Sequence, residues 1–142
     1  MKTTEDRTTW LIDKSALTRL ERCLDPDIWA DRIDRGLVHV TTLTLLEVGY
    51  SARSAQDLEH LLYGLPLAAM PVAYLTPTIE DRAVQILSAL AGRGQHRAPS
   101  LPDLLIAAVA ERSGFTVLHV DKDFELIVEV TNQAWEWLSI EE

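Results

Sequence analysis

Cysteine and long apolar runs are both scarce in this sequence. The single cysteine, Cys23, has no disulfide partner within the chain, so nothing points to an oxidising compartment, and we expect it to be a small buried residue. The longest uncharged stretch, residues 61–79, contains four helix breakers, which exclude a membrane-spanning helix. These are Gly64, Pro66, Pro71 and Pro77. The N-terminus, residues 1–7, does not lead into the apolar segment of a signal peptide, so we expect a cytoplasmic location.

Basic residues are also few: 13 Lys and Arg stand against 22 Asp and Glu, which gives a net charge of −9. Broad, charge-driven binding of nucleic acid needs a basic surface, and this balance argues against it. A nuclease is still compatible, because bound cations can offset a local acidic cluster, and a basic protein partner is favoured. The composition, 47% hydrophobic and 25% charged with no repeat or linker, predicts one globular domain over residues 1–142.

Short apolar runs alternate with amphipathic segments along the chain. The runs expected to form strands are residues 10–12, 37–40, 68–72, 116–120 and 134–138. The segments expected to form helices are residues 14–24, 26–35, 42–53, 55–63, 78–91, 101–112 and 122–128. Pro71 places the third strand at an edge of the sheet or shortens it. Strands that alternate with helices predict an α/β sandwich around a mostly parallel sheet.

Four acidic residues are placed by these elements at one edge of the sheet. Asp13 and Asp121 come directly after strands, so both project from the carboxyl edge, where ligands gather in parallel sheets. Glu47 lies near the start of a helix that follows a strand, so it also reaches this edge. Asp103 lies in the first turn of a helix that enters a strand, so its position depends on the preceding loop. The sequence therefore places two of these carboxylates directly and two less directly.

Carboxylates gathered in this way raise one another's pKa unless a cation lies among them. Oxygen ligands without a nearby histidine or thiolate favour Mg²⁺ or Mn²⁺ over zinc. Such an ion lowers the pKa of a bound water and stabilises charge on a phosphoryl oxygen. The acidic set thus indicates hydrolysis of a phosphodiester bond.

Each acidic residue also has a structural interpretation. Asp103 and Glu47 lie three residues after a serine or threonine, the spacing of a capping box in which the acidic side chain accepts a backbone N–H. Asp121 is equally suited to be the N-cap of the helix that follows it. Asp13, directly after an apolar strand, is harder to explain structurally.

Four segments that contain these residues occur in a fixed order. They are Leu11-Ile12-Asp13-Lys14-Ser15-Ala16-Leu17, Thr44-Leu45-Leu46-Glu47, Pro102-Asp103-Leu104-Leu105-Ile106-Ala107-Ala108 and His119-Val120-Asp121-Lys122-Asp123-Phe124. In this order they resemble the acidic motifs of PIN-domain ribonucleases, most closely the VapC toxins of bacterial VapBC modules. The likeness covers residues 10–138 and includes the loop of residues 94–97. It implies a PIN-like three-layer α/β/α sandwich with a sheet of four to five strands.

The resemblance also implies roles for the acidic residues. Asp13, Asp103 and Asp121 match metal ligands, with Asp13 and Asp103 as the principal pair. Glu47 matches the second acidic position, which ligates directly or holds a metal-bound water. All four would thus be catalytic, with Mg²⁺ or Mn²⁺ as the cofactor.

Supporting residues are implied in the same way. Ser15 matches a small hydroxyl residue that supports the first aspartate, and Asp123 either assists the site or caps the next helix. His119 departs from the family, because many PIN domains have threonine or serine there; inside an apolar strand, a core histidine is more typical than a catalytic base. Candidates for contact with RNA phosphates are Arg93, His96 and Arg97. A solvated loop beside an acidic surface explains these three equally well.

The predicted helical hairpins carry more apolar residues than one core needs. Among them are Trp29, Tyr50, Leu61, Leu62 and Tyr63. The family resemblance implies a groove here for a VapB-like antitoxin with a basic tail, which an acidic toxin suits. It also implies a homodimer and larger toxin–antitoxin assemblies. Ordinary core packing explains any single one of these residues.

The leading hypothesis is an Mg²⁺- or Mn²⁺-dependent endoribonuclease, the toxin of a type II toxin–antitoxin system, in which water attacks the RNA phosphodiester. The alternative is a non-catalytic PIN-like module that binds protein or RNA, which the complete acidic set disfavours. A phosphatase with Asp121 and Asp123 as a DxD nucleophile motif is a third hypothesis. It is disfavoured because such enzymes place this motif after their first strand.

Overall fold

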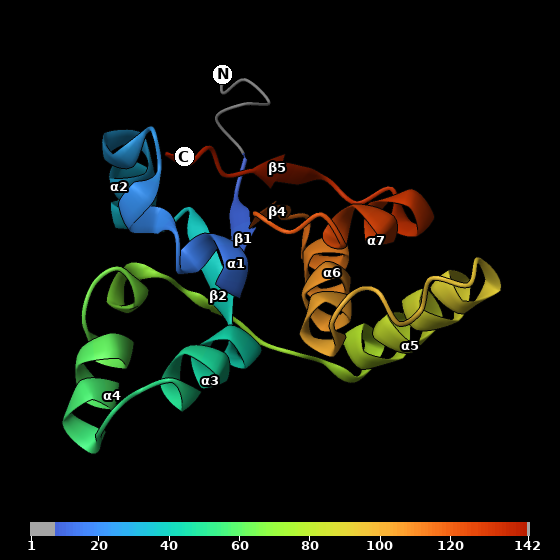
Figure 1. Ribbon diagram of the computed structural model, residues 1–142, viewed down its shortest axis with the longest axis horizontal. Helices are drawn as coiled ribbons and strands as arrows, with labels where there is room; N and C mark the ends of the chain where they lie inside the picture. Colours follow the sequence, from blue (N-terminus) through green and yellow to red (C-terminus); the bar gives the residue numbers. More distant parts are fainter. Residues whose placement is uncertain (1–7, 142) are drawn as a thin grey trace.

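A five-stranded sheet forms the centre of the structure, a computed structural model that describes residues 8–141. The N-terminal residues that bear on the signal-peptide expectation lie mostly outside this range. The strands are β1 (Trp10–Ile12), β2 (Val38–Thr41), β3 (Val72–Ala73), β4 (Thr116–His119) and β5 (Trp135–Trp137). They lie in the order β3-β2-β1-β4-β5, and every neighbouring pair is parallel (Figure 1). The predicted parallel sheet of four to five strands is therefore confirmed.

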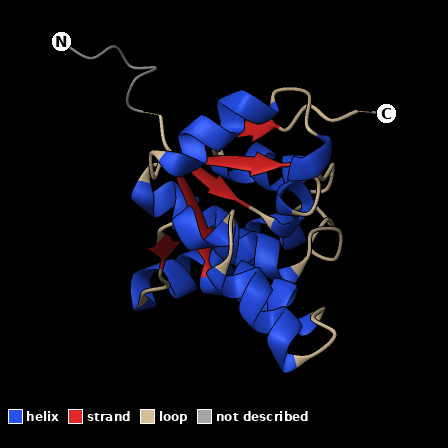
Figure 2. Ribbon diagram, turned by 90° about the vertical axis from the view of Figure 1, so that its left-hand side faces the viewer, coloured by secondary structure: helices blue, strands red, loops and turns tan. Residues whose placement is uncertain are grey.

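Helices cover both faces of this sheet, which confirms the three-layer sandwich (Figures 1 and 2). One face carries α5 (Pro77–Gly92), α6 (Leu101–Ser113) and α7 (Phe124–Thr131). The other carries α1 (Lys14–Leu17), α2 (Pro26–Asp34), α3 (Thr42–Tyr50) and α4 (Ala55–Tyr63), with the short 3₁₀ turns η2 (Leu20–Arg22) and η3 (Leu67–Ala69). Within residues 8–141, no helix combines the length and the apolar character needed to cross a membrane.

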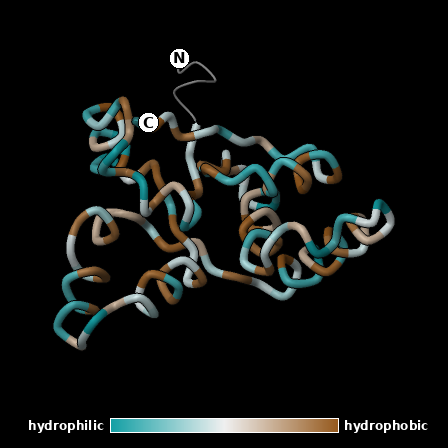
Figure 3. Tube along the Cα trace, viewed as in Figure 1, coloured by the Kyte–Doolittle hydropathy of each residue, from teal (hydrophilic) through white to brown (hydrophobic). Residues whose placement is uncertain are grey.

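The central strands serve two cores at once. Leu11 and Val117 belong to the core beneath α5, α6 and α7, whereas Trp10, Ile12 and Leu118 belong to the core beneath α1 and α2. Side chains alternate between the faces of a strand, so a sheet that is covered on both faces needs continuously apolar strands. Hydrophilic residues are therefore left to the periphery. Figure 3 shows hydrophilic segments at outer turns such as those between α3 and α4 and after α5.

Two elements differ from the sequence-based prediction. The helix expected over residues 14–24 is divided into α1 and η2, because the chain bends here and Cys23 forms an antiparallel bridge with Ile140. Cys23 itself is buried, as expected. The third strand shrinks to two residues at the sheet edge, which agrees with the effect expected of Pro71.

Helix α6 lies at the middle of one core and fixes the place of Asp103. Six of its residues beyond Asp103 are buried, and four of them are the small or β-branched run Ala107–Ala110. Helix α5 packs over it, and Arg82 of α5 donates to both carboxylate oxygens of Glu111 at 2.7 and 3.1 Å. A bidentate pair of this kind holds two helices in register as well as adding attraction.

Replacement of Ile86 tests how far stability depends on this core. Ile86 of α5 is fully buried, so Ile86→Ala is expected to lower the free energy of unfolding by about 2–5 kcal/mol in chemical denaturation. Val84, two residues earlier and 67% exposed, provides the matched control, and Val84→Ala is expected to change it by less than about 0.5 kcal/mol. Equal effects of the two substitutions would contradict the packing of α5 described here.

Candidate active site

All four predicted acidic residues line one cavity of about 210 Å³, here called the acidic cavity. Asp13 follows β1 and Asp121 lies two residues beyond β4, and these are neighbouring parallel strands, so both residues emerge at the same carboxyl edge. Glu47 reaches the cavity from α3, which follows β2 directly, and Asp103 from the first turn of α6. The loop before α6 thus brings Asp103 to the place that the sequence left open.

Asp13 combines a structural and an open carboxylate oxygen. It is 2% exposed, and its Oδ1 accepts hydrogen bonds from the Ser15 hydroxyl at 2.7 Å and from the Ala16 N–H at 3.0 Å, which caps α1. Its own N–H continues the bonding between β1 and β4 by donating to the Leu118 carbonyl at 3.1 Å. Both described bonds to the carboxylate fall on one oxygen, so Oδ2 remains for a ligand.

Ser15 connects the two strand ends that carry the site. Its hydroxyl donates to Asp13 and accepts from the Val120 N–H at 2.9 Å, across 105 residues of sequence. The supporting role that the family resemblance implied for Ser15 is thus matched by a direct contact with Asp13.

Asp103 is buried, and its carboxylate is not used as a cap. The Ser100 hydroxyl accepts from the Asp103 N–H at 3.3 Å, which is one half of the capping box considered from the sequence. The other half, in which the Asp103 carboxylate would accept from the Ser100 N–H, is absent from the hydrogen bonds of the described chain. The Asp103 Oδ2 atom is buried and has no partner. A buried acceptor without a partner is costly, so this oxygen is suited to a cation.

The capping-box interpretation of Glu47 is wrong. Thr41, not Thr44, is the N-cap of α3, because its hydroxyl accepts from the Thr44 N–H at 3.2 Å. Glu47 consequently lies in the second turn of the helix, half-buried, with its side chain at the acidic cavity. Its position is not explained by helix capping.

Asp121 shapes the turn after β4 without capping a helix. Its Oδ1 accepts from the Asp123 N–H at 2.9 Å, and its carbonyl accepts from the Phe124 N–H at 3.2 Å. This turn delays the expected helix, so that α7 begins at Phe124. Asp123 is the N-cap residue but its side chain makes no capping bond; it is exposed and is not among the residues that line the acidic cavity.

Burial and like charges act together on two of these carboxyl groups. Burial, with a smaller contribution from Asp121 and Glu47, raises the pKa of Asp13 from 3.8 to about 6. Burial, together with the charges of Asp13 and Asp121, raises the pKa of Asp103 from 3.8 to about 7. The metal-free cavity is therefore electrostatically unfavourable at neutral pH, and a cation would relieve it.

The donor set fits a hard divalent cation. Carboxylates supply it, with no histidine or cysteine among the residues that line the cavity. Across residues 8–141, no three His, Cys, Asp or Glu side chains already approach closely enough to enclose an ion. Convergence on a cation would thus require side-chain movements, for which the unpartnered Oδ2 of Asp103 and the Oδ2 of Asp13 are available.

Two basic residues of the acidic cavity were missed in the sequence analysis. Lys14 and Arg19 both line it, and Arg19 also donates to the Ser15 carbonyl at 2.8 Å. A signal for them was present, because Lys14 follows Asp13 directly and Arg19 lies one helical turn after Ser15. They place positive charge next to the carboxylates, where a phosphate would approach.

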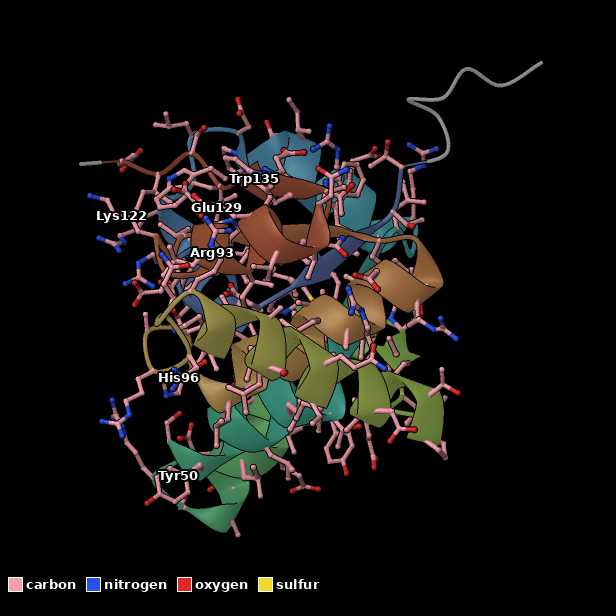
Figure 4. All side chains as sticks on the ribbon, turned by 90° about the vertical axis from the view of Figure 1, so that its right-hand side faces the viewer. Tyr50, Arg93, His96, Lys122, Glu129 and Trp135 are labelled. Carbon is pink, nitrogen blue, oxygen red and sulfur yellow. The ribbon has the colours of Figure 1, made fainter. Side chains whose placement is uncertain are left out.

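The three residues predicted to contact RNA lie outside the acidic cavity. Arg93 forms an ion pair with Glu129 of α7 at 3.1 Å, and Figure 4 shows the two side chains together. His96 and Arg97 are exposed on the loop between α5 and α6, and the same view places His96 on this loop. Arg93 is thus already neutralised by a neighbour, whereas His96 and Arg97 face solvent.

A larger and mainly apolar groove of about 570 Å³ lies beside α2, here called the α2 groove. Its lining includes Trp29, Ala30, Ile33, Leu65, Pro66 and Ala69, with the acidic residues Glu21, Asp31 and Asp34. Of the five apolar residues singled out from the sequence, only Trp29 lines it. Tyr50 and Tyr63 are 93% and 76% exposed, and Leu61 and Leu62 pack against the core beneath α1 and α2. Leu62 and Tyr63 line a separate, smaller groove of about 400 Å³, together with Leu45 and Leu67.

Comparison with known proteins agrees with this geometry. Residues 11–130 match the family model described as PIN domain, and the chain belongs to the PIN-domain family. It is 58% identical to ribonuclease VapC2 of Mycobacterium tuberculosis and 40% identical to ribonuclease VapC51 of that species, covering 92% and 91% of this chain and 92% of each relative. The resemblance to VapC-type PIN-domain ribonucleases is thus confirmed. The solved structure of VapBC2 from Rickettsia felis has the same fold, with a TM-score of 0.74 at 14% identity over 93% of this chain and all of that one.

The raised pKa values predict an unusual pH dependence of stability. A carboxyl group with a raised pKa binds a proton more tightly in the folded state, so its contribution to stability is present below pH 3.8 and is lost as the pH rises through about 6 to 7. In EDTA, Asp103→Asn is therefore expected to melt close to the wild type at pH 4 and to melt higher at pH 8, by on the order of 5 °C.

The exposed Asp123→Asn variant is the control, and its difference from the wild type is expected to stay the same at both pH values. An Asp103→Asn protein that is destabilised equally at pH 4 and pH 8 would show that the carboxylate is not under electrostatic strain.

Proposed function

We propose that this protein is a VapC-type endoribonuclease that hydrolyses RNA phosphodiester bonds with Mg²⁺ or Mn²⁺. The observation that carries the proposal is the convergence of four carboxylates on one cavity, one of them with a buried oxygen that has no partner. The family membership and the names of the relatives, which are ribonucleases, support the same activity. Asp13, Asp103 and Asp121 would hold the cation, and Glu47 would complete the set.

The choice of cation rests on ligand chemistry. Oxygen-only ligands favour Mg²⁺ and Mn²⁺, which keep part of their water shell and bind through a few carboxylates. When bound, such an ion would supply Lewis-acid stabilisation of the phosphoryl group and lower the pKa of the attacking water. The cavity of about 210 Å³ leaves room for water and for one phosphate group beside the carboxylates.

The side chains of this protein have separate tasks in that reaction. Ser15 fixes the Asp13 carboxylate by its hydrogen bond to Oδ1. Lys14 and Arg19 would attract the phosphate and offset the negative charge that the carboxylates present to it. His96 and Arg97 would contact phosphates further along the RNA, and Arg93 would join them only by leaving Glu129.

The two other hypotheses are weaker on structural grounds. A module that only binds would not need a buried, unpartnered carboxylate oxygen, because this arrangement destabilises the fold without serving a contact. A DxD phosphatase needs both aspartates at the reacting group, but the Asp123 side chain is exposed and is not part of the acidic cavity.

Replacement of the proposed ligands tests the activity. Asp13→Asn and Asp103→Asn are each expected to reduce metal-dependent cleavage of total RNA roughly 100-fold or more, because each removes a charge that holds the cation. Asn keeps an oxygen where Asp13 accepts from Ser15 and Ala16, so the fold is expected to persist in that variant. Cleavage would be followed by gel in Mg²⁺, in Mn²⁺ and in EDTA.

Asp123→Asn provides the matched control, since this neighbouring carboxylate is outside the acidic cavity, and wild-type activity is expected. If the Asp13→Asn and Asp103→Asn proteins, purified in the same way, cut as fast as the wild type, the active site proposed here is wrong.

We further propose that the partner is a VapB-like antitoxin with a basic tail, which docks an apolar helix face in the α2 groove. The groove has a mainly apolar lining that includes three acidic residues, a surface that suits an amphipathic and basic segment. Solved structures of the same fold are described as VapBC complexes, some of them with DNA. From the family membership we also propose a single domain over residues 1–142 and a cytoplasmic location. We propose in addition that the protein forms homodimers within a larger toxin–antitoxin assembly.

Filling the groove tests this partner. Ala30 is exposed and lines the α2 groove, so Ala30→Trp is expected to leave RNA cleavage unchanged and to raise about tenfold the antitoxin concentration needed for half inhibition. The probe would be the VapB-like antitoxin proposed here. Ala89→Trp on α5, an exposed position on the opposite side of the sheet, is expected to affect neither quantity. Unchanged inhibition of Ala30→Trp would place the antitoxin elsewhere.

A further inference from the structure

His119 occupies an unusual position between an aromatic cluster and the acidic cavity. It is the last residue of β4 and is fully buried. Its ring centroid lies 4.8 Å from that of Phe124, 5.6 Å from Trp135 and 5.3 Å from Trp137. Figure 4 shows Trp135 of this cluster on β5, above α7. The imidazole thus fills the space between β5 and the start of α7.

One nitrogen of this ring reaches the backbone of the site. Nδ1 accepts a hydrogen bond from the N–H of Asp121 at 3.1 Å. The preceding amide, that of Val120, donates to the Ser15 hydroxyl at 2.9 Å. The chain that leaves β4 is therefore held at two successive amides by side chains, where bonding between strands has ended. On its far side, Asp121 is held by the bond from Phe124 to its carbonyl.

The other nitrogen shows why the residue is not simply part of the core. Nε2 is buried and has no hydrogen-bond partner among the residues that the structure describes. A buried nitrogen of this kind destabilises the fold, and a phenylalanine would fill the same aromatic cluster without it. The Nδ1 bond is then the contribution that an apolar ring could not make.

We infer that His119 is a positioning residue for Asp121, whose backbone it holds so that the carboxylate stays directed at the cation in the acidic cavity. The inference rests on the proposed function for the role of that cation. It concerns the Nδ1 acceptor, because this is the imidazole atom that bonds to the Asp121 backbone. Groups behind a metal ligand commonly change metal affinity about 10–100-fold when they are removed.

Two substitutions separate the acceptor from the ring. In His119→Phe the aromatic packing is kept and the acceptor is lost. In His119→Asn the Oδ1 atom stands at the same number of bonds from the backbone as Nδ1 and can accept from the amide two residues on, as asparagine does in Asx turns, but the ring is lost. The variants therefore exchange one property for the other.

The two variants are expected to rank in opposite order in Mn²⁺ affinity and in melting temperature. By calorimetric titration with Mn²⁺, His119→Phe is expected to bind at least about tenfold more weakly than the wild type, and His119→Asn within about threefold of it. The melting temperature is expected to fall more in His119→Asn, since it loses the packing against three rings. A purely structural histidine would make Mn²⁺ affinity follow the melting temperature instead. Hydrogen exchange of the Asp121 amide in metal-free protein is expected to accelerate in His119→Phe and not in His119→Asn.

His39 supplies the control. It also packs on an aromatic ring, that of Phe115 at 4.4 Å, and has a buried Nδ1 without a partner, but it pairs with Leu11 in mid-sheet and does not line the acidic cavity. His39→Phe is expected to leave Mn²⁺ affinity unchanged. The inference is overturned if His119→Phe binds Mn²⁺ as the wild type does, or if His119→Asn loses as much affinity as His119→Phe. A wild-type protein that binds no Mn²⁺ overturns the proposed function, and the exchange of the Asp121 amide then decides alone whether His119 holds this residue.

Discussion

Burial of carboxylates close to one another is the constraint on which the rest of this structure depends. Asp13 and Asp103 are both buried, and burial is the larger cause of their raised pKa values, to which the charges of neighbouring carboxylates add. Such a cluster does not stabilise the chain, so its place must be fixed by favourable interactions elsewhere. The two apolar cores on either side of β1 and β4 supply these interactions, and they lie directly behind the strand ends that carry the site.

The arrangement of the strands makes the site a property of the complete fold. Asp13 follows β1, and one of the two strands beside β1, β4, comes about a hundred residues later in the chain. Ser15 joins these distant segments by one hydroxyl, which donates to Asp13 and accepts from Val120. The complete set of carboxylates therefore depends on contacts between segments that lie far apart in the sequence.

Much of this could be predicted from residue patterns, and the failures have identifiable causes. Strand ends follow from apolar runs, so Asp13 and Asp121 were placed correctly at the carboxyl edge. Helix starts were less certain, because several hydroxyl residues compete as caps; Thr41 rather than Thr44 begins α3. Contacts between separate elements, such as the ion pair of Arg93 with Glu129, leave no trace in local periodicity. Lys14 and Arg19 were overlooked because the segment after Asp13 was read as an ordinary helix, although its first turn faces the cavity.

The net charge of −9 affects how this protein binds a polyanionic substrate such as RNA. Overall repulsion is weak beyond a Debye length of about 8 Å at physiological ionic strength, so the charges near the cavity matter more than the total. Lys14 and Arg19 lie there beside four carboxylates, whose charge a bound cation would offset further. A net charge of −9 gives no long-range attraction to RNA, so binding of RNA would rest on short-range contacts near the cavity. The same surplus of negative charge extends to the α2 groove, where Glu21, Asp31 and Asp34 would attract the basic partner proposed above.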